Sequence, residues 1–66
     1  MLTERNKEII LALAECNMNQ SEVSRVKYLH INTVIFHIQK IRENTGLDPK
    51  NFYDLIKLVE MAKDGE

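Results

Sequence analysis

The apolar residues of this chain recur every three to four positions in four separate segments, which is the period of an amphipathic α-helix. The clearest repeat lies near the C-terminal end, where Phe52, Leu55, Ile56 and Val59 follow the i, i+3, i+4, i+7 pattern. Only two glycines and one proline interrupt the chain. The pattern therefore predicts four helices, over residues 3–16, 20–27, 31–45 and 50–63.

Capping residues mark the ends of these predicted helices. Thr3 precedes the first helix, and Asn19 opens an Asn-Gln-Ser-Glu sequence with the spacing of a capping box. Gly46 follows the third helix, at a position where a left-handed residue commonly ends a helix. The fourth helix has two alternative starts, at Pro49 or at Phe52.

Residues 20–45 have the arrangement of a helix-turn-helix, because a short helix and a tight turn precede a longer helix. We expect an all-α fold of four helices, with a three-helical core, a C-terminal helix and no wing. A chain of 66 residues forms at most one small domain, so this domain covers residues 1–66. With the first helix packed beside them, the residues expected in the core are Val23, Leu29, Val34, Ile38, Ile41, Phe52, Leu55, Ile56 and Val59.

The composition excludes several classes of protein. Its hydrophobic share of 44% and charged share of 29% are typical of a soluble globular domain. The longest apolar run, residues 9–14, is too short to cross a membrane. A single cysteine, Cys16, excludes an intramolecular disulfide, and we expect a cytoplasmic protein.

Catalytic and metal-binding chemistry is not indicated. The chain has neither a nucleophile–histidine motif nor a glycine-rich phosphate loop. Cys16, His30 and His37 are too few and too scattered for a metal site. We expect structural roles for both histidines, His30 as a helix cap or turn residue and His37 beside the core. We therefore expect that the protein is not an enzyme and that it binds no cofactor, metal or small-molecule ligand.

Charge is distributed unevenly along the chain. Nine basic and ten acidic residues give a net charge of −1. The segment from Val23 to Arg42, however, contains four basic residues and no acidic one. A basic segment between acidic ends predicts contact with an anionic partner.

The predicted helix over residues 31–45 presents a polar face apart from its core stripe when projected at about 100° per residue. In a helix-turn-helix this second helix lies in the major groove of DNA. Asn and Gln side chains can form two hydrogen bonds to adenine there. The residues expected to contact bases are Asn32, Ile35, Phe36 and Gln39, and those expected to contact the DNA backbone are Arg25, Lys27, Thr33, Lys40 and Arg42.

The apolar residues of this helix allow other interpretations. Ile31 and Ile35 flank the core stripe. They form either the edge of the core or a surface that contacts thymine methyl groups or a protein partner. Phe36 either contacts bases or packs against the fourth helix.

Three segments resemble the C-terminal helix-turn-helix domain of PucR-type transcriptional regulators. They are Asn-Gln-Ser-Glu-Val-Ser-Arg at 19–25, His-Ile-Asn-Thr-Val at 30–34 and Ile-Arg-Glu-Asn-Thr-Gly-Leu-Asp at 41–48. The resemblance covers about residues 17–62. Leu-Thr-Glu-Arg at 2–5 and Thr33-Val34 are also similar to the LuxR-type helix-turn-helix. Both resemblances imply a bacterial DNA-binding module that regulates transcription.

The chain departs from the PucR pattern at three positions. Ile31 stands where the family has arginine, and Ile35 stands at a DNA-facing position that is often basic. Lys27 replaces a buried leucine, and we expect Val26 to take its place by a small rotation.

Two functions from different classes follow. The first is a regulator module that binds double-stranded DNA, and the second is a protein-interaction module that keeps the fold without reading bases. The basic segment, Asn32 and Gln39 favour the first, whereas the net charge, Ile31 and Ile35 favour the second. A homodimer is a further expectation, because helix-turn-helix proteins commonly pair to read two half-sites. Its expected contact residues are Leu58 and Met61, with or without Leu11.

Overall fold

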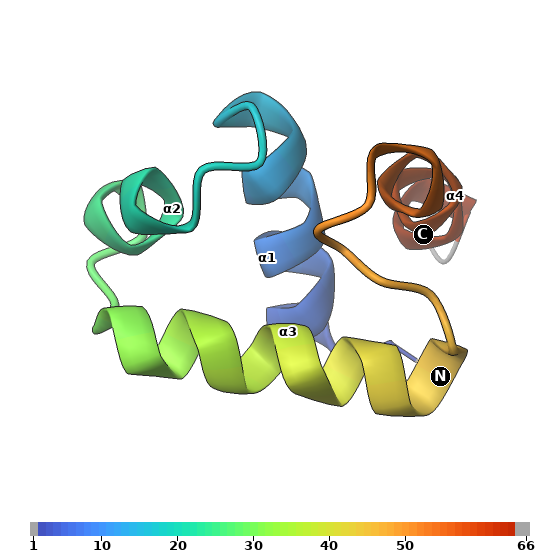
Figure 1. The fold of residues 1–66 in the computed structure, drawn as a ribbon, viewed down its shortest axis with the longest axis horizontal. Helices are drawn as coiled ribbons and strands as arrows, with labels where there is room; N and C mark the ends of the chain where they lie inside the picture. The colour runs from blue at the N-terminus through green and yellow to red at the C-terminus, as the bar shows by residue number, and fades with distance from the viewer. Residues whose placement is uncertain (1, 65–66) are drawn as a thin grey trace.

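The chain folds into four helices around a central first helix (Figure 1). The computed structural model describes residues 2–64, and the helices are α1 (Glu4–Glu15), α2 (Gln20–Val26), α3 (Ile31–Thr45) and α4 (Phe52–Asp64). α1 packs against each of the other three helices, and α2 also packs against α3. α2 and α4 lie on opposite sides of α1, and α3 crosses below it in the view of Figure 1. The all-α helix-turn-helix fold predicted from the sequence is confirmed.

Local hydrogen bonds explain where the first three helices begin and end. The Thr3 hydroxyl accepts a hydrogen bond from the Asn6 N–H (3.1 Å), and the Asn19 side chain accepts one from the Glu22 N–H (3.0 Å). Both satisfy backbone donors that a helix start leaves unpaired. Gly46 ends α3 at φ 74°, a left-handed conformation that glycine adopts without steric cost.

α4 begins at the later of its two predicted starts. The Asn51 side chain accepts hydrogen bonds from the N–H groups of Tyr53 (3.0 Å) and Asp54 (3.1 Å). The Asp54 carboxylate in turn accepts a hydrogen bond from the Asp48 N–H at 3.1 Å. Pro49 lies buried in the turn before the helix. Asn51 is therefore the cap, and α4 starts at Phe52.

The core forms where α1 meets the other three helices. Ile9, Ile10 and Leu13 of α1 are fully buried. Of the residues predicted for the core, Leu29 and Val59 are partly buried and pack against it. The predicted core residues that are buried are Val23, Val34, Ile38, Ile41 and Leu55.

The predicted buried face of α4 is wrong in part. Phe52 is 60% exposed and Ile56 is 43% exposed, whereas Leu58 and Ala62 are buried. The reason is that α4 packs on α1 alone and makes no close backbone contact with α2 or α3 within residues 2–64. A single helix covers only a narrow stripe of its neighbour, and the apolar arc of α4 is wider than that stripe. The edge of the arc that contains Leu58 therefore packs against α1, and the edge that contains Phe52 and Ile56 stays in solvent.

The buried stripe of α4 also overturns the expected dimer contact. Leu58 is fully buried, so it cannot meet a second copy of the folded chain. Leu11 is partly buried and packs against the core. Of the three residues expected at that contact, Met61 is exposed.

Val26 does not take the buried position expected for it. Its side chain is exposed, and Lys27 is exposed as the C-cap residue of α2. α2 ends here, and the chain turns away at once into a left-handed residue, Tyr28. The small rotation that would bury Val26 therefore does not occur.

None of the helices described in residues 2–64 is long and apolar enough to cross a membrane.

Candidate nucleic-acid interface

The turn between α2 and α3 is held by backbone hydrogen bonds at the end of α2. The Leu29 N–H donates to the Ser24 carbonyl (2.9 Å), and the Tyr28 N–H donates to the Arg25 carbonyl (3.3 Å). This pair of bonds is a Schellman motif, which reverses the chain in a few residues. Tyr28 takes the left-handed position at φ 55°, where glycine is more usual. The motif fixes the entry of the chain into α3.

His30 caps α3. Its Nδ1 atom accepts a hydrogen bond from the Asn32 N–H at 3.0 Å. The Thr33 and Val34 N–H groups both donate to the His30 carbonyl, at 2.9 and 3.2 Å. The structural role expected for His30 is therefore confirmed. Because the Asn32 backbone and not its side chain makes the cap, the Asn32 amide stays exposed.

α3 has a buried face toward α1 and α2 and an outer face in solvent. Val34, Ile38 and Ile41 form the buried face, as predicted. The exposed residues of its first three turns are Asn32, Ile35, Phe36, Gln39 and Lys40. Each residue expected to contact bases is therefore accessible. Whether these residues touch DNA remains a prediction.

Phe36 lies in the middle of the outer face. It is 52% exposed, and α3 and α4 make no close backbone contact within the described chain. The alternative in which Phe36 packs against the fourth helix is therefore wrong. The ring of His37 meets Phe36 edge-on, with ring centroids 5.4 Å apart. The Lys40 Nζ lies over the Phe36 ring, 5.6 Å from its centroid. Both neighbours lie on α3 itself, so the Phe36 ring makes its aromatic and cation contacts within its own helix.

The two flanking isoleucines differ in exposure. Ile31 is partly buried at the first position of α3. Ile35 is 37% exposed and belongs to the outer face.

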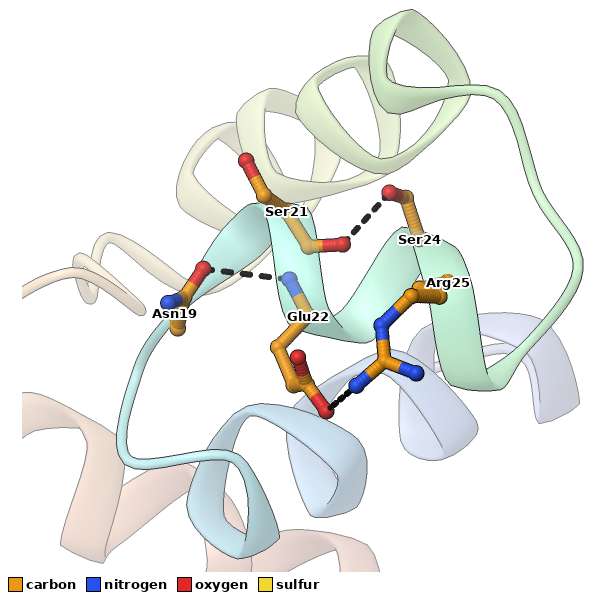
Figure 2. A network of polar contacts seen from close by, with 5 residues as sticks. All are labelled: Asn19, Ser21, Glu22, Ser24 and Arg25. Atoms are coloured by element: carbon orange, nitrogen blue, oxygen red, sulfur yellow. Dashed lines mark hydrogen bonds and ion pairs between the residues drawn. The ribbon is translucent and has the colours of Figure 1, made fainter.

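Two of the residues expected to contact the DNA backbone, Arg25 and Lys40, are paired with carboxylates of the same chain. Figure 2 shows the Arg25 guanidinium bonded to the Glu22 carboxylate on α2. That hydrogen bond lowers the pKa of Glu22 and raises the pKa of Arg25 from their ordinary values. On α3 the Lys40 Nζ lies 3.5 Å from the Glu43 carboxylate. Exposed pairs of this kind are weak, so a phosphate can displace either carboxylate.

The other residues expected to contact the DNA backbone come from the end of α2 and from α3. Lys27 and Arg42 are exposed and form no ion pair with any residue between positions 2 and 64. Thr33 is partly buried in the first turn of α3. The helix-turn-helix unit therefore presents four cations on α2 and α3, and two of them are paired with carboxylates. Its positive charge is smaller than the basic segment alone indicates.

The ion pairs of Arg25 and Lys40 could have been predicted from the spacing of the charged residues in the sequence. Glu22 and Arg25, and likewise Lys40 and Glu43, stand three positions apart on their helices. Side chains at this spacing face one another along a helix. The acids just outside the basic segment therefore partly neutralise it.

The family model of the PucR C-terminal helix-turn-helix domain matches residues 7–61. The match begins in α1, contains the whole of α2 and α3, and ends near the end of α4. The chain belongs to this family. No curated protein and no solved structure matches the chain. PucR-type helix-turn-helix domains are regulatory modules and not a family of enzymes.

The first turns of α3 in this PucR-type domain carry two isoleucines that are half-buried or exposed. Ile31 is half-buried at the start of α3, and Ile35 places an apolar side chain on the outer face of α3. The residues between 31 and 39, which form the first turns of α3, include no lysine or arginine. Within α3 the cations Lys40 and Arg42 therefore both lie in the second half.

Proposed function

We propose that this PucR-type domain binds double-stranded DNA, with α3 in the major groove, and so acts as a transcription regulator module in the bacterial cytoplasm. The observation that carries the proposal is the outer face of α3. It places two amide side chains, Asn32 and Gln39, in solvent on one side of a helix whose other side is buried. Amides are suited to adenine in the major groove.

Basic residues around α3 support the proposal by their positions. Arg25 and Lys27 come from the end of α2, and Lys40 and Arg42 come from the second half of α3. Together with the Thr33 hydroxyl, they contact phosphates on either side of the groove. Phosphate contacts hold the register of the helix but carry no sequence information. Base selection is left to the outer face of α3.

Salt dependence is the first test. Each neutralised phosphate releases counterions, so about four basic contacts predict a slope of log affinity against log salt near −3 to −4. Arg42→Ala should make that slope less steep by about one unit and weaken binding to all sequences alike. Fluorescence anisotropy with mixed-sequence duplexes over a range of salt measures both quantities. Lys63→Ala, which removes an exposed lysine from the end of α4, is the matched control and should leave the slope unchanged.

A contrasting variant separates base contacts from backbone contacts. Asn32→Ala should keep the wild-type salt slope, and should cost about 1–3 kcal/mol on a preferred site but little on random DNA. Its backbone cap from His30 is retained, so the helix start is unaffected. If the wild type shows no binding to any duplex at about 50 mM salt, the protein-interaction function replaces DNA binding. Ile35 is then the first residue to test as its contact.

We also propose that the chain forms a homodimer through α4, by a surface other than the one first expected. Phe52 and Ile56 are exposed and line an apolar groove with Met18 and Val59. Glu60 lies at the rim of the groove. Two antiparallel α4 helices would cover this apolar surface and bring Lys57 of each copy near Glu60 of the other, a charge-complementary arrangement.

Ile56→Glu should therefore convert a dimer into a folded monomer, because it places a charge in the apolar contact. Sedimentation equilibrium at several concentrations measures the change. Met61→Glu is the control, since Met61 is equally exposed but projects to the opposite flank of α4. A wild type that remains monomeric at all concentrations, or a dimer that Ile56→Glu does not weaken, contradicts the homodimer.

A further inference from the structure

The outer face of α3 carries an apolar group between its two amides. Phe36 stands four positions after Asn32 and three positions before Gln39. Side chains at these spacings are neighbours on a helix surface. All three are exposed, so together they form one continuous row of amide, aromatic ring and amide. We call Asn32, Phe36 and Gln39 the reading row.

Each member of the reading row matches an A·T base pair better than a G·C pair. In the major groove adenine presents one donor and one acceptor, which an Asn or Gln amide satisfies with two hydrogen bonds. Thymine presents the 5-methyl group, which favours contact with an apolar side chain. Guanine presents two acceptors and is most often contacted by arginine or lysine. Residues 31–39 contain neither of these residues.

The lysine that follows the reading row, Lys40, is held by contacts within α3. Lys40 lies over the Phe36 ring and beside the Glu43 carboxylate (3.5 Å), so its ammonium is held at the edge of the reading row. From there it can reach a phosphate when Glu43 releases it. Ile35 adds a second exposed apolar side chain next to Phe36. The centre of the outer face is therefore uncharged and apolar, with its positive charge at the rim.

We infer that the target of this domain is A·T-rich duplex DNA, in which Phe36 contacts the 5-methyl group of a thymine flanked by adenines bound by Asn32 and Gln39. The inference rests on the proposed function and names the DNA that it recognises. Phe36 is the specificity-determining residue. Its ring contacts His37 edge-on and lies under the Lys40 ammonium, and its remaining surface is open to a thymine methyl.

Replacing thymidine with deoxyuridine tests the methyl contact directly, because deoxyuridine lacks only the 5-methyl group and still pairs with adenine. The probes are a duplex pool of mixed A·T sequence, the same pool with deoxyuridine in place of thymidine, and a pool of mixed G·C sequence. We expect the wild type to bind the A·T pool at least about ten-fold more tightly than the G·C pool. Loss of one buried methyl contact should weaken binding by about four-fold.

The variants separate Phe36 from general effects of uracil on DNA. Phe36→Ala should bind the thymine and uracil pools equally, and Phe36→Leu, which keeps an apolar side chain, should retain part of the difference. Tyr53→Ala is the matched control, because it removes an exposed aromatic ring from α4 outside the apolar groove and should leave the difference intact. Both Phe36 and Tyr53 are more than half exposed, so the alanine variants should fold, which circular dichroism verifies.

The outcomes distinguish this inference from the proposed function. If the wild type binds the thymine and uracil pools equally, or if Phe36→Ala keeps the difference, thymine reading by Phe36 is overturned. In that case salt-dependent binding to any pool still supports DNA binding through α3. If no pool is bound at about 50 mM salt, the proposed function fails and the inference fails with it.

Discussion

Ile41→Ala should destabilise the domain by about 2–5 kcal/mol, which is the usual cost of truncating a fully buried isoleucine. Ile41 is completely buried in the middle of α3, where that helix packs on α1. The truncation removes apolar contacts and leaves a cavity that the neighbouring helices fill only in part. A domain of this size has a free energy of unfolding of only a few kcal/mol. The variant should therefore be largely unfolded at moderate temperature.

Urea denaturation followed by circular dichroism measures this loss. Ile35→Ala is the matched control, since it makes the same chemical change on the same helix at a side chain that is 37% exposed. Its cost should be well below that of Ile41→Ala, because less apolar surface returns to water. Equal losses for the two variants would mean that the buried face of α3 is assigned incorrectly.

Leu58→Glu should prevent the domain from folding. Leu58 is fully buried between α4 and α1, and it belongs to the stripe that also contains Leu55 and Ala62. The substitution removes a buried apolar side chain and places a carboxylate without a partner in the core. The combined penalty is several kcal/mol, which exceeds the stability expected of a domain this small. We expect no cooperative thermal transition and exchange of all backbone amides at unprotected rates.

Ile56→Glu is the control for this prediction and stands two positions earlier on the same helix. Its side chain is 43% exposed, so the new carboxylate reaches water and the domain should still fold. The pair of variants tests which face of α4 lies against α1. A folded Leu58→Glu variant beside an unfolded Ile56→Glu variant would reverse the packing described above and restore the face indicated by the apolar repeat.

The candidate DNA-binding surface could be predicted largely from the sequence, because α3 has a simple pattern. Its three buried residues repeat at intervals of four and three positions, so the opposite face follows from projection alone. Asn32, Phe36 and Gln39 are exposed as that projection indicates. The partial neutralisation of the basic segment was missed, because Glu22 and Glu43 stand just outside the window that contains no acid.

The sequence by itself determined the four helices and left only the start of α4 open, because helix ends depend on interactions within a few residues. Thr3, Asn19 and Gly46 cap helices through contacts to backbone groups at most four positions away, so local spacing was sufficient to predict them. It also determined the helix-turn-helix unit, since a short helix and a long helix joined by a tight turn have few ways to pack.

Only the tertiary structure decided which edge of a wide apolar arc is buried. Leu58 and Ile56 lie at the two edges of the apolar arc of α4 in a helical projection. The residues around them in the sequence do not indicate which edge is buried. α4 packs on α1 alone, which buries Leu58 and leaves Phe52 and Ile56 in solvent. The exposure of Phe36 was decided in the same way, by the separation of α3 from α4. Such choices depend on where a distant helix lies, and that position is a property of the whole packed core.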